Sequence, residues 1–175
     1  MSEYYLNTEN INDWVQTLKA GDSVFLTGVI YTARDAAHKR IYQLYQNQMA
    51  LPFDLSDSII YYAGPTPAKE GLAVGSIGPT TSSRMDCFSP FMMTLGQKAM
   101  IGKGNRSAEV VEAIKKQKAV YFAAIGGAGA LYSRCIEKCQ VVAFDDLGCE
   151  SVKKLCVKDF PLLVAIDSDG NSIYK

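Results

Sequence analysis

Short apolar segments alternate with helix-like segments along most of this chain, and no other feature of the sequence constrains its fold as strongly. Several of the apolar segments end in glycine-rich or Gly-Pro turns, which is typical of strands. The predicted strands are residues 23–28, 58–63, 98–101, 119–125, 141–144, 162–166 and 173–174. The predicted helices are residues 11–18, 32–49, 107–117 and 130–139. This alternation predicts an α/β fold in one compact domain that covers residues 1–175.

Three of the connections are informative. Residues 64–78 are rich in glycine, contain Pro65 and Pro67, and form the longest loop-like segment, and long ordered loops often carry function. Asn105 or Ser107 is expected to cap the helix of residues 107–117. Residues 167–170 form a predicted turn between the last two strands.

The composition excludes several classes of protein. Hydrophobic residues make up 48% of the 175 residues, which is too many for a disordered chain. The 18 basic residues are matched by 18 acidic ones, so no net positive charge favours nucleic acid as a partner. No apolar stretch is long enough to span a membrane, and the first residues do not resemble a secretion signal. Five cysteines without such a signal indicate reduced thiols in the cytoplasm.

Metal ligands are scarce in the sequence. His38 is the only histidine, which excludes a site built on two imidazoles. The five cysteines include no CxxC pair, so we expect no metal site made by this chain alone. Cys135 and Cys139 are expected on one face of a helix, as buried thiols without a chemical role.

Residues 78–86, with the sequence GPTTSSRMD, place four hydroxyl groups in a row ahead of an arginine. If Asp86 lies in the first turn of a helix, these hydroxyls, the free backbone N–H groups and Arg84 would form a cradle for an anion. The alternative is a turn rich in serine and threonine that only caps a helix.

Two further motifs place cations at predicted strand ends. In residues 32–40, TARDAAHKR, Arg34 and His38 share a helix face directly after a strand, where α/β sheets usually bind ligands. In residues 101–107, IGKGNRS, Lys103 lies between two glycines that leave it open to a ligand. A solvated helix start and a simple turn are the alternatives.

Residues 126–129, GGAG, follow a predicted buried strand, and two aspartates come about 20 residues later, as in a dinucleotide-binding fingerprint. The match is flawed because Tyr132 occupies the third glycine position. We therefore expect close packing of a helix against a strand here, with nucleotide binding as the lesser alternative.

The motifs TARDAAHKR, GPTTSSRMD and IGKGNRS occur in this order, with YYAGPTPAKEG before the second and DFPLLVAIDSDGN near the end. This set closely resembles the β-subunit of two-subunit class I fumarate hydratases and the C-terminal domain of single-chain class I fumarases. It also resembles the β-subunit of L-tartrate dehydratase. The resemblance runs from about Leu18 to the end of the chain, and it implies a swivelling β/β/α domain.

The resemblance also implies a site shared between two subunits. A partner α-subunit would carry a 4Fe-4S cluster on three cysteines, with one iron free to bind substrate as a Lewis acid, and this chain would ligate no metal. Two αβ pairs would associate as a dimer. The implied reaction is the reversible hydration of fumarate to L-malate, with L-tartrate dehydration as the alternative. A non-catalytic module for a small anion or nucleotide, or a structural subunit, is the alternative from another class.

The roles of individual residues follow from the same resemblance. The substrate would be a small dicarboxylate, and Arg34 and Arg84 would each hold one carboxylate in a bidentate fork. Lys103 would add a point charge. Thr80 matches the family's threonine base, which removes a proton from the carbon next to a carboxylate and needs a neighbouring group to deprotonate it. His38 would orient Arg34 or touch the substrate.

Overall fold

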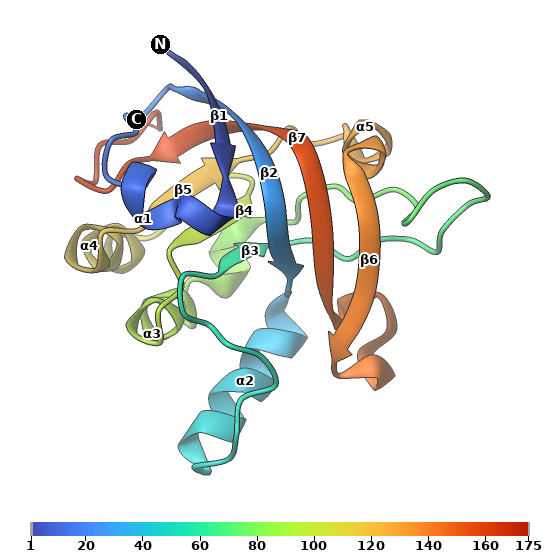
Figure 1. Ribbon diagram of the computed structural model, residues 1–175. Coiled ribbons are helices and arrows are strands. Elements are labelled where there is room, and N and C mark those ends of the chain that lie inside the picture. The colour runs from blue at the N-terminus through green and yellow to red at the C-terminus, as the bar shows by residue number, and fades with distance from the viewer. Residues whose placement is uncertain (1, 175) are drawn as a thin grey trace.

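Seven strands form one sheet in the computed structural model, which describes residues 2–174. The strands are β1 (Glu3–Asn7), β2 (Ser23–Thr32), β3 (Ile59–Tyr61), β4 (Ala99–Gly102), β5 (Val120–Ala123), β6 (Ile136–Ala143) and β7 (Val152–Ile166). Their order is β1-β2-β3-β4-β5-β7-β6, and β7 also pairs with β2. The strands β2, β3, β4, β5 and β7 therefore close into a barrel-like ring within a single α/β domain, which confirms the predicted class (Figure 1).

Helices and 3-10 turns connect the strands of this ring. The helices are α1 (Ile11–Trp14), α2 (Asp35–Gln46), α3 (Ser89–Thr94), α4 (Ala108–Gln117) and α5 (Gly129–Arg134), with 3-10 turns η1 (Thr8–Asn10), η2 (Ser82–Met85) and η3 (Asp145–Glu150). Figure 1 shows α2, α3 and α4 along one side of the sheet, and the loop of residues 64–78 extending past β6. No helix within residues 2–174 is long and apolar enough to cross a membrane.

The central strands β3, β4 and β5 are buried on both faces. Successive side chains of a strand point to opposite faces, so Ile59 and Tyr61 join one hydrophobic cluster while Ile60 joins another. Helices α2 and α4 add Ile41 and Ile114 to the cluster of Ile60, which is therefore the outer one. Each such side chain stabilises the fold by roughly 1.5–3 kcal/mol when it is fully buried. Strands buried on both faces form continuous apolar segments, which is why the sequence predicted these three.

Strand β7 closes the ring because it pairs along both of its edges. Its first half lies between β6 and β2, and its second half lies between β2 and β5. Asp159, between the two halves, has a φ of 48°, and the register with β2 shifts between Leu26 and Gly28. An extra residue in one strand bends the pair and increases its twist. This bend lets one strand of 15 residues reach from one side of the ring to the next.

Several predicted elements are wrong in extent or type. The predicted helix of residues 130–139 ends at Arg134, and β6 follows it from Ile136 because that segment pairs with β7. Cys139 is therefore on a strand and does not share a helix face with Cys135. Strand β7 begins ten residues before the predicted 162–166, and β1 was not predicted at all. Residues 173–174 form no strand, and an isolated bridge joins Ile166 to Ser172 there.

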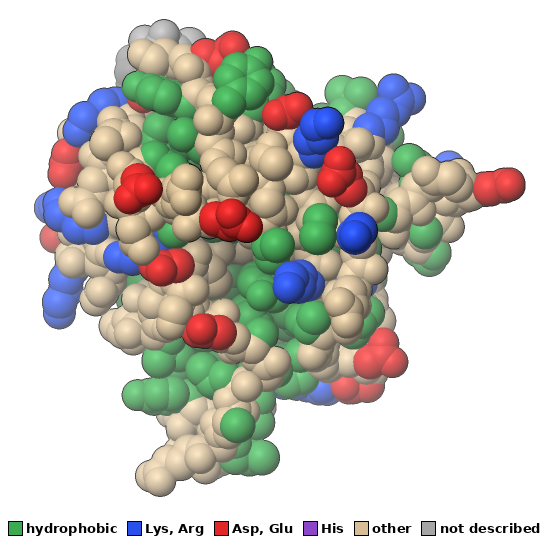
Figure 2. All heavy atoms as spheres, in the orientation of Figure 1, with side chains coloured by type: hydrophobic (Ala, Val, Ile, Leu, Met, Phe, Trp, Pro, Cys, Tyr) green, Lys and Arg blue, Asp and Glu red, His purple; other side chains and the backbone are tan. Residues whose placement is uncertain are grey.

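Other predictions are confirmed. Strands at 58–63, 98–101 and 119–125 and the helix at 107–117 are present with small changes at their ends. Ser107 is the cap of α4, because its side chain accepts a hydrogen bond from the backbone N–H of Val110. The face in Figure 2 mixes basic and acidic side chains with hydrophobic ones between them, in keeping with the balanced charge of the sequence.

Candidate functional site

The carboxyl ends of β2, β3 and β4 meet at one rim of the ring, because these strands run parallel to one another. Backbone pairing continues past the strand ends. Ala33 N donates to Tyr61 O at 3.1 Å, and Tyr62 N donates to a carbonyl of β4 at 2.8 Å. Arg34 follows β2 and Lys103 follows β4, so both cations start from this rim. Open α/β sheets bind ligands at the carboxyl ends of their strands.

The segment with the sequence GPTTSSR runs across the same rim. Thr80 N donates to Tyr62 O at 2.7 Å, and Ser82 N donates to Lys103 O at 2.9 Å. Thr81 and Lys103 also form an isolated parallel bridge. The backbones of Thr80 and Lys103, two residues predicted to share a site, therefore lie on neighbouring segments.

The helix-based anion cradle is not formed. Asp86 follows the 3-10 turn η2 instead of lying in the first turn of a helix. The Ser82 hydroxyl is buried and accepts a hydrogen bond from the Tyr121 hydroxyl at 2.9 Å. The serine- and threonine-rich segment thus serves in part to join the rim to β5. The positive charge of the rim comes from its arginine and lysine side chains and not from the N-terminus of a helix.

Carboxylates of this chain pair with both predicted arginines. Arg84 Nη2 donates to Asp35 Oδ2 at 2.8 Å. Arg34 Nε lies 2.9 Å from Glu150 Oε1 and 4.0 Å from Asp35 Oδ1, but its N–H is not aligned for a hydrogen bond to either oxygen. The Arg34 side chain is 23% exposed and that of Arg84 is 49% exposed, so both remain open to a ligand. The sequence analysis did not predict these pairs.

Arg106 is a buried support that the sequence analysis did not single out, although it lies in the motif IGKGNRS. Its Nε donates to Asp86 Oδ1 at 2.6 Å, and its Nη2 donates to Ser89 Oγ at 2.6 Å. The other oxygen of Asp86 accepts from Ser107 N at 2.7 Å. The guanidinium also lies 4.9 Å from the centre of the Tyr121 ring. These contacts tie the end of η2 to β5 and to the start of α4, and so fix the segment that carries Thr80.

His38 lies below the rim and not on it. Its imidazole is fully buried, and Nδ1 lies 2.8 Å from the backbone carbonyl of Arg34. Burial lowers the pKa of His38 from 6.5 to about 4, although the hydrogen bond to Arg34 acts in the opposite direction. His38 is therefore neutral at pH 7. Direct contact with a substrate would require an exposed ring, whereas its contact with Arg34 suits the orienting role, which stays a prediction.

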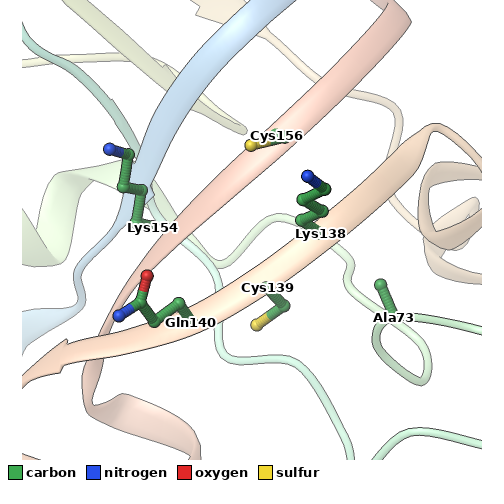
Figure 3. Close-up of a pocket in the computed structure, with 6 residues that line it drawn as sticks. All are labelled: Ala73, Lys138, Cys139, Gln140, Lys154 and Cys156. Carbon is green, nitrogen blue, oxygen red and sulfur yellow. The ribbon is translucent and has the colours of Figure 1, made fainter.

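A separate hollow of about 480 Å³ lies on β6 and β7 (Figure 3). None of its lining residues belongs to the rim; they are Ala73, Lys138, Cys139, Gln140, Lys154 and Cys156. Lys138 is exposed and Lys154 is half-buried, and no buried polar side chain is aimed into the hollow among its lining residues. We therefore place the candidate site at the rim.

The glycines of residues 126–129 serve close packing. A Cβ on Gly129 would lie 2.4 Å from Ser76 Oγ and 2.9 Å from Gly78 N, and the Gly129 carbonyl accepts from Ile77 N. The close contact is made with the end of the loop of residues 64–78, and not with a strand as predicted. Gly126 approaches the side chain of Lys103, so this turn borders the rim.

Metal ligands are not gathered in the described chain. All five cysteines are free thiols. Within residues 2–174, no three His, Cys, Asp or Glu side chains are placed so that they could hold a metal ion. An iron–sulfur cluster needs three or four thiolates brought together, and the described residues do not supply them.

A family model described as "Fumarase C-terminus" matches residues 1–175. The chain belongs to the fumarase C-terminus family. The resemblance inferred from the motifs is thus confirmed, and the rim described above carries three of them, TARDAAHKR, GPTTSSRMD and IGKGNRS.

Curated relatives of this fumarase C-terminus chain fall into two groups. The chain is 44% identical over 179 residues to "Putative L(+)-tartrate dehydratase subunit beta" of Methanocaldococcus jannaschii, covering 99% of this chain and 91% of the relative. It is 38% identical over 168 residues to "Fumarate hydratase 2" of Leishmania major, covering 95% of this chain and 30% of the relative. It is 38% identical over 152 residues to "Fumarate hydratase class I, aerobic" of Escherichia coli K12, covering 86% of this chain and 28% of the relative. The chain thus spans less than a third of the fumarate hydratases it matches.

The Asp86–Arg106 pair gives a first prediction for this family member. The variant Asp86→Asn leaves a buried guanidinium without its carboxylate, so we expect the free energy of unfolding to fall by about 3 kcal/mol. The double variant Asp86→Leu with Arg106→Met removes both charges and is expected to lose less. Urea denaturation measures both losses. A loss below about 1 kcal/mol in the single variant would show that Arg106 does not depend on Asp86.

The buried histidine gives a second prediction. The unfolded chain titrates at His38 near pH 6.5 and the folded chain near pH 4, so the unfolded chain binds more protons between these values. The free energy of unfolding should fall by up to about 1.4 kcal/mol per pH unit as the pH drops from 6.5. Urea denaturation between about pH 7 and pH 5 measures this slope above the carboxylate range. The variant His38→Gln should flatten it, and an unchanged slope would contradict the assignment.

Proposed function

We propose that this chain is the β-subunit of an iron–sulfur hydro-lyase that reversibly hydrates fumarate to L-malate. It would supply the dicarboxylate-binding and proton-transfer residues to a site shared with an α-subunit. Membership in the fumarase C-terminus family supports the reaction class. The observation that carries the proposal is the Asp35 carboxylate held beside two guanidinium groups at an open rim. A pair of arginines arranged around one carboxylate is suited to accept the carboxylates of a small diacid.

The proposed roles use four side chains of the rim. Arg34 and Arg84 each grip one carboxylate of the substrate, and Lys103 adds a compact positive charge. Thr80 takes the proton from the carbon next to a carboxylate and returns it in the reverse direction. A threonine hydroxyl is a weak base at its ordinary pKa, so a neighbouring group must first remove its proton. The positive charges of the rim favour that alkoxide, since an opposite charge nearby stabilises an ionised group.

The partner would complete the site. The described residues offer no ligand set for a 4Fe-4S cluster, so we assign the cluster to the α-subunit and derive no step through it. Residues 1–175 would act as one swivelling β/β/α domain that moves as a unit against the partner. We further propose a dimer of αβ pairs. The free thiols suit a reducing compartment, so the proposed location is the cytoplasm.

Reconstitution tests the shared site. The isolated chain should be colourless and inactive, and addition of a cluster-loaded α-subunit should yield hydration of fumarate, followed by the loss of its ultraviolet absorbance. The α-subunit alone is the control. Robust hydratase activity from this polypeptide without a partner would contradict the split site.

Arg84 provides the matching test of the rim. The variant Arg84→Ala should abolish turnover by the reconstituted pair, because it removes a guanidinium that binds one carboxylate of the substrate. Folding and subunit association should stay intact. Arg134→Ala, at an exposed arginine in α5, is the control and should retain activity. Steady-state kinetics and gel filtration measure the two effects. A near-normal rate in Arg84→Ala would remove this residue from the site.

L-tartrate dehydration is the second candidate reaction. It is favoured by the 44% identity to a relative named as a tartrate dehydratase subunit, of which this chain covers 91%. Both substrates are dicarboxylates, so the two arginines serve either one. A panel of fumarate, malate and the tartrate stereoisomers on the reconstituted pair decides between the reactions.

A further inference from the structure

The Asp35 carboxylate lies between the two arginines of the rim. One oxygen accepts a hydrogen bond from Arg84 at 2.8 Å, and the other lies 4.0 Å from Arg34 Nε. That second oxygen is buried and has no hydrogen-bond partner among the described residues. Asp35 is also the first residue of α2, where the helix dipole stabilises a negative charge. One fixed anion therefore faces both guanidinium groups.

A second carboxylate forms an ion pair with Arg34. Glu150 Oε1 lies 2.9 Å from Arg34 Nε, and Glu150 is the last residue of η3. The buried Lys153 ammonium anchors this turn by donating to Gly148 O at 2.9 Å and to Ser151 Oγ at 2.6 Å. Glu150 is therefore presented to Arg34 by a segment that is itself fixed to β7.

Close backbone packing keeps this arrangement in place. A Cβ on Gly64 would lie 2.9 Å from the carbonyl of Cys149 and 3.4 Å from Arg34 Cδ. Only the absence of a side chain at Gly64 allows the η3 turn and the stem of Arg34 to approach the end of β3. The stem of Arg34 thus lies close to the backbone at Gly64, while its Nε lies beside the Glu150 carboxylate.

We propose that Asp35 and Glu150 are positioning residues that hold Arg34 and Arg84 ready for a dicarboxylate substrate. This inference rests on the proposed function and extends it to two residues without an assigned role. The rim carries three cations and these two carboxylates, so it keeps one net positive charge. The two carboxylates weaken the attraction of the rim for a dianion. They also fix the orientation of the two guanidinium groups that bind it.

Opposed effects of one substitution make the proposal testable. The variant Asp35→Asn raises the net charge of the rim, which strengthens ground-state binding of a dianion, but it releases Arg84 from its anchor. A small misplacement of a positioning group costs up to about 100-fold in rate. We therefore expect kcat of the reconstituted pair to fall at least tenfold, while KM for malate stays unchanged or falls. The variant Asp35→Glu keeps the charge and should recover part of kcat.

A matched control separates this effect from a general loss of charge. Asp169 lies between two exposed cations outside the rim, Lys19 at 3.0 Å and Lys118 at 3.2 Å. The variant Asp169→Asn removes the same charge from an equivalent arrangement and should leave kcat and KM unchanged. Unchanged kcat in Asp35→Asn would overturn the proposal, and so would a raised KM with normal kcat, which would mean that Asp35 itself binds substrate.

A second measurement keeps the inference distinguishable from the proposed function. If the wild-type pair shows no hydro-lyase activity, the proposed function fails, but the arginine anchors can still be tested on the isolated chain. Phenylglyoxal modification of Arg84, followed by mass spectrometry, should become at least threefold faster in Asp35→Asn. Modification of Arg134 is the internal reference and should not change. An unchanged rate at Arg84 would overturn the positioning role independently of activity.

Discussion

The pairing of β7 with three other strands is the constraint on which the rest of the structure depends. Strand β7 lies between β6 and β2 in its first half and between β2 and β5 in its second, so it turns an open parallel sheet into a ring. Ring closure pairs β2 with β7, leaves β1 and β6 as the edge strands, and separates an inner core from an outer one. The carboxyl ends of the parallel strands β2, β3 and β4 lie at one end of this ring. The candidate site exists because this arrangement brings Arg34, Thr80 and Lys103 to one rim.

A second layer of structure converts the rim into a fixed arrangement of charges. Arg106 is buried beneath it, bonded to Asp86 and Ser89, and two tyrosine rings face its guanidinium. A buried ion pair is weak evidence for net stability, because desolvation offsets most of the Coulomb attraction. Its effect here is geometric. It joins the segment of Thr80 to α4, just as Lys153 joins η3 to β7. The solvent-exposed cations of the rim thus lie on segments that buried Arg106 and Lys153 fix in place.

The sequence allowed prediction of those parts of the fold in which one local pattern dominates. Strands β3 to β5 are apolar throughout because both faces are buried, and α4 has both a helical period and a capping serine. Strand β7 was largely missed because Lys153, Lys154 and Lys158 interrupt its apolar residues. The two pairs that hold the arginines join positions far apart in the chain, such as Asp35 and Arg84, and no local pattern encodes them. The motifs located the cations, but only the fold shows what holds them.

The electrostatics of the rim bear on the proposal that a partner completes the site. Arg84 and Lys103 project into solvent, where an ion pair at 4 Å contributes only about 1 kcal/mol. The net charge left by the rim's own carboxylates does not balance a dianion. Coverage by a partner would exclude water and strengthen every charge interaction at the rim several-fold, since the effective dielectric constant falls. The same coverage would bring further groups against the substrate. A rim of oriented but solvated cations is therefore weak alone and effective when buried against a second surface.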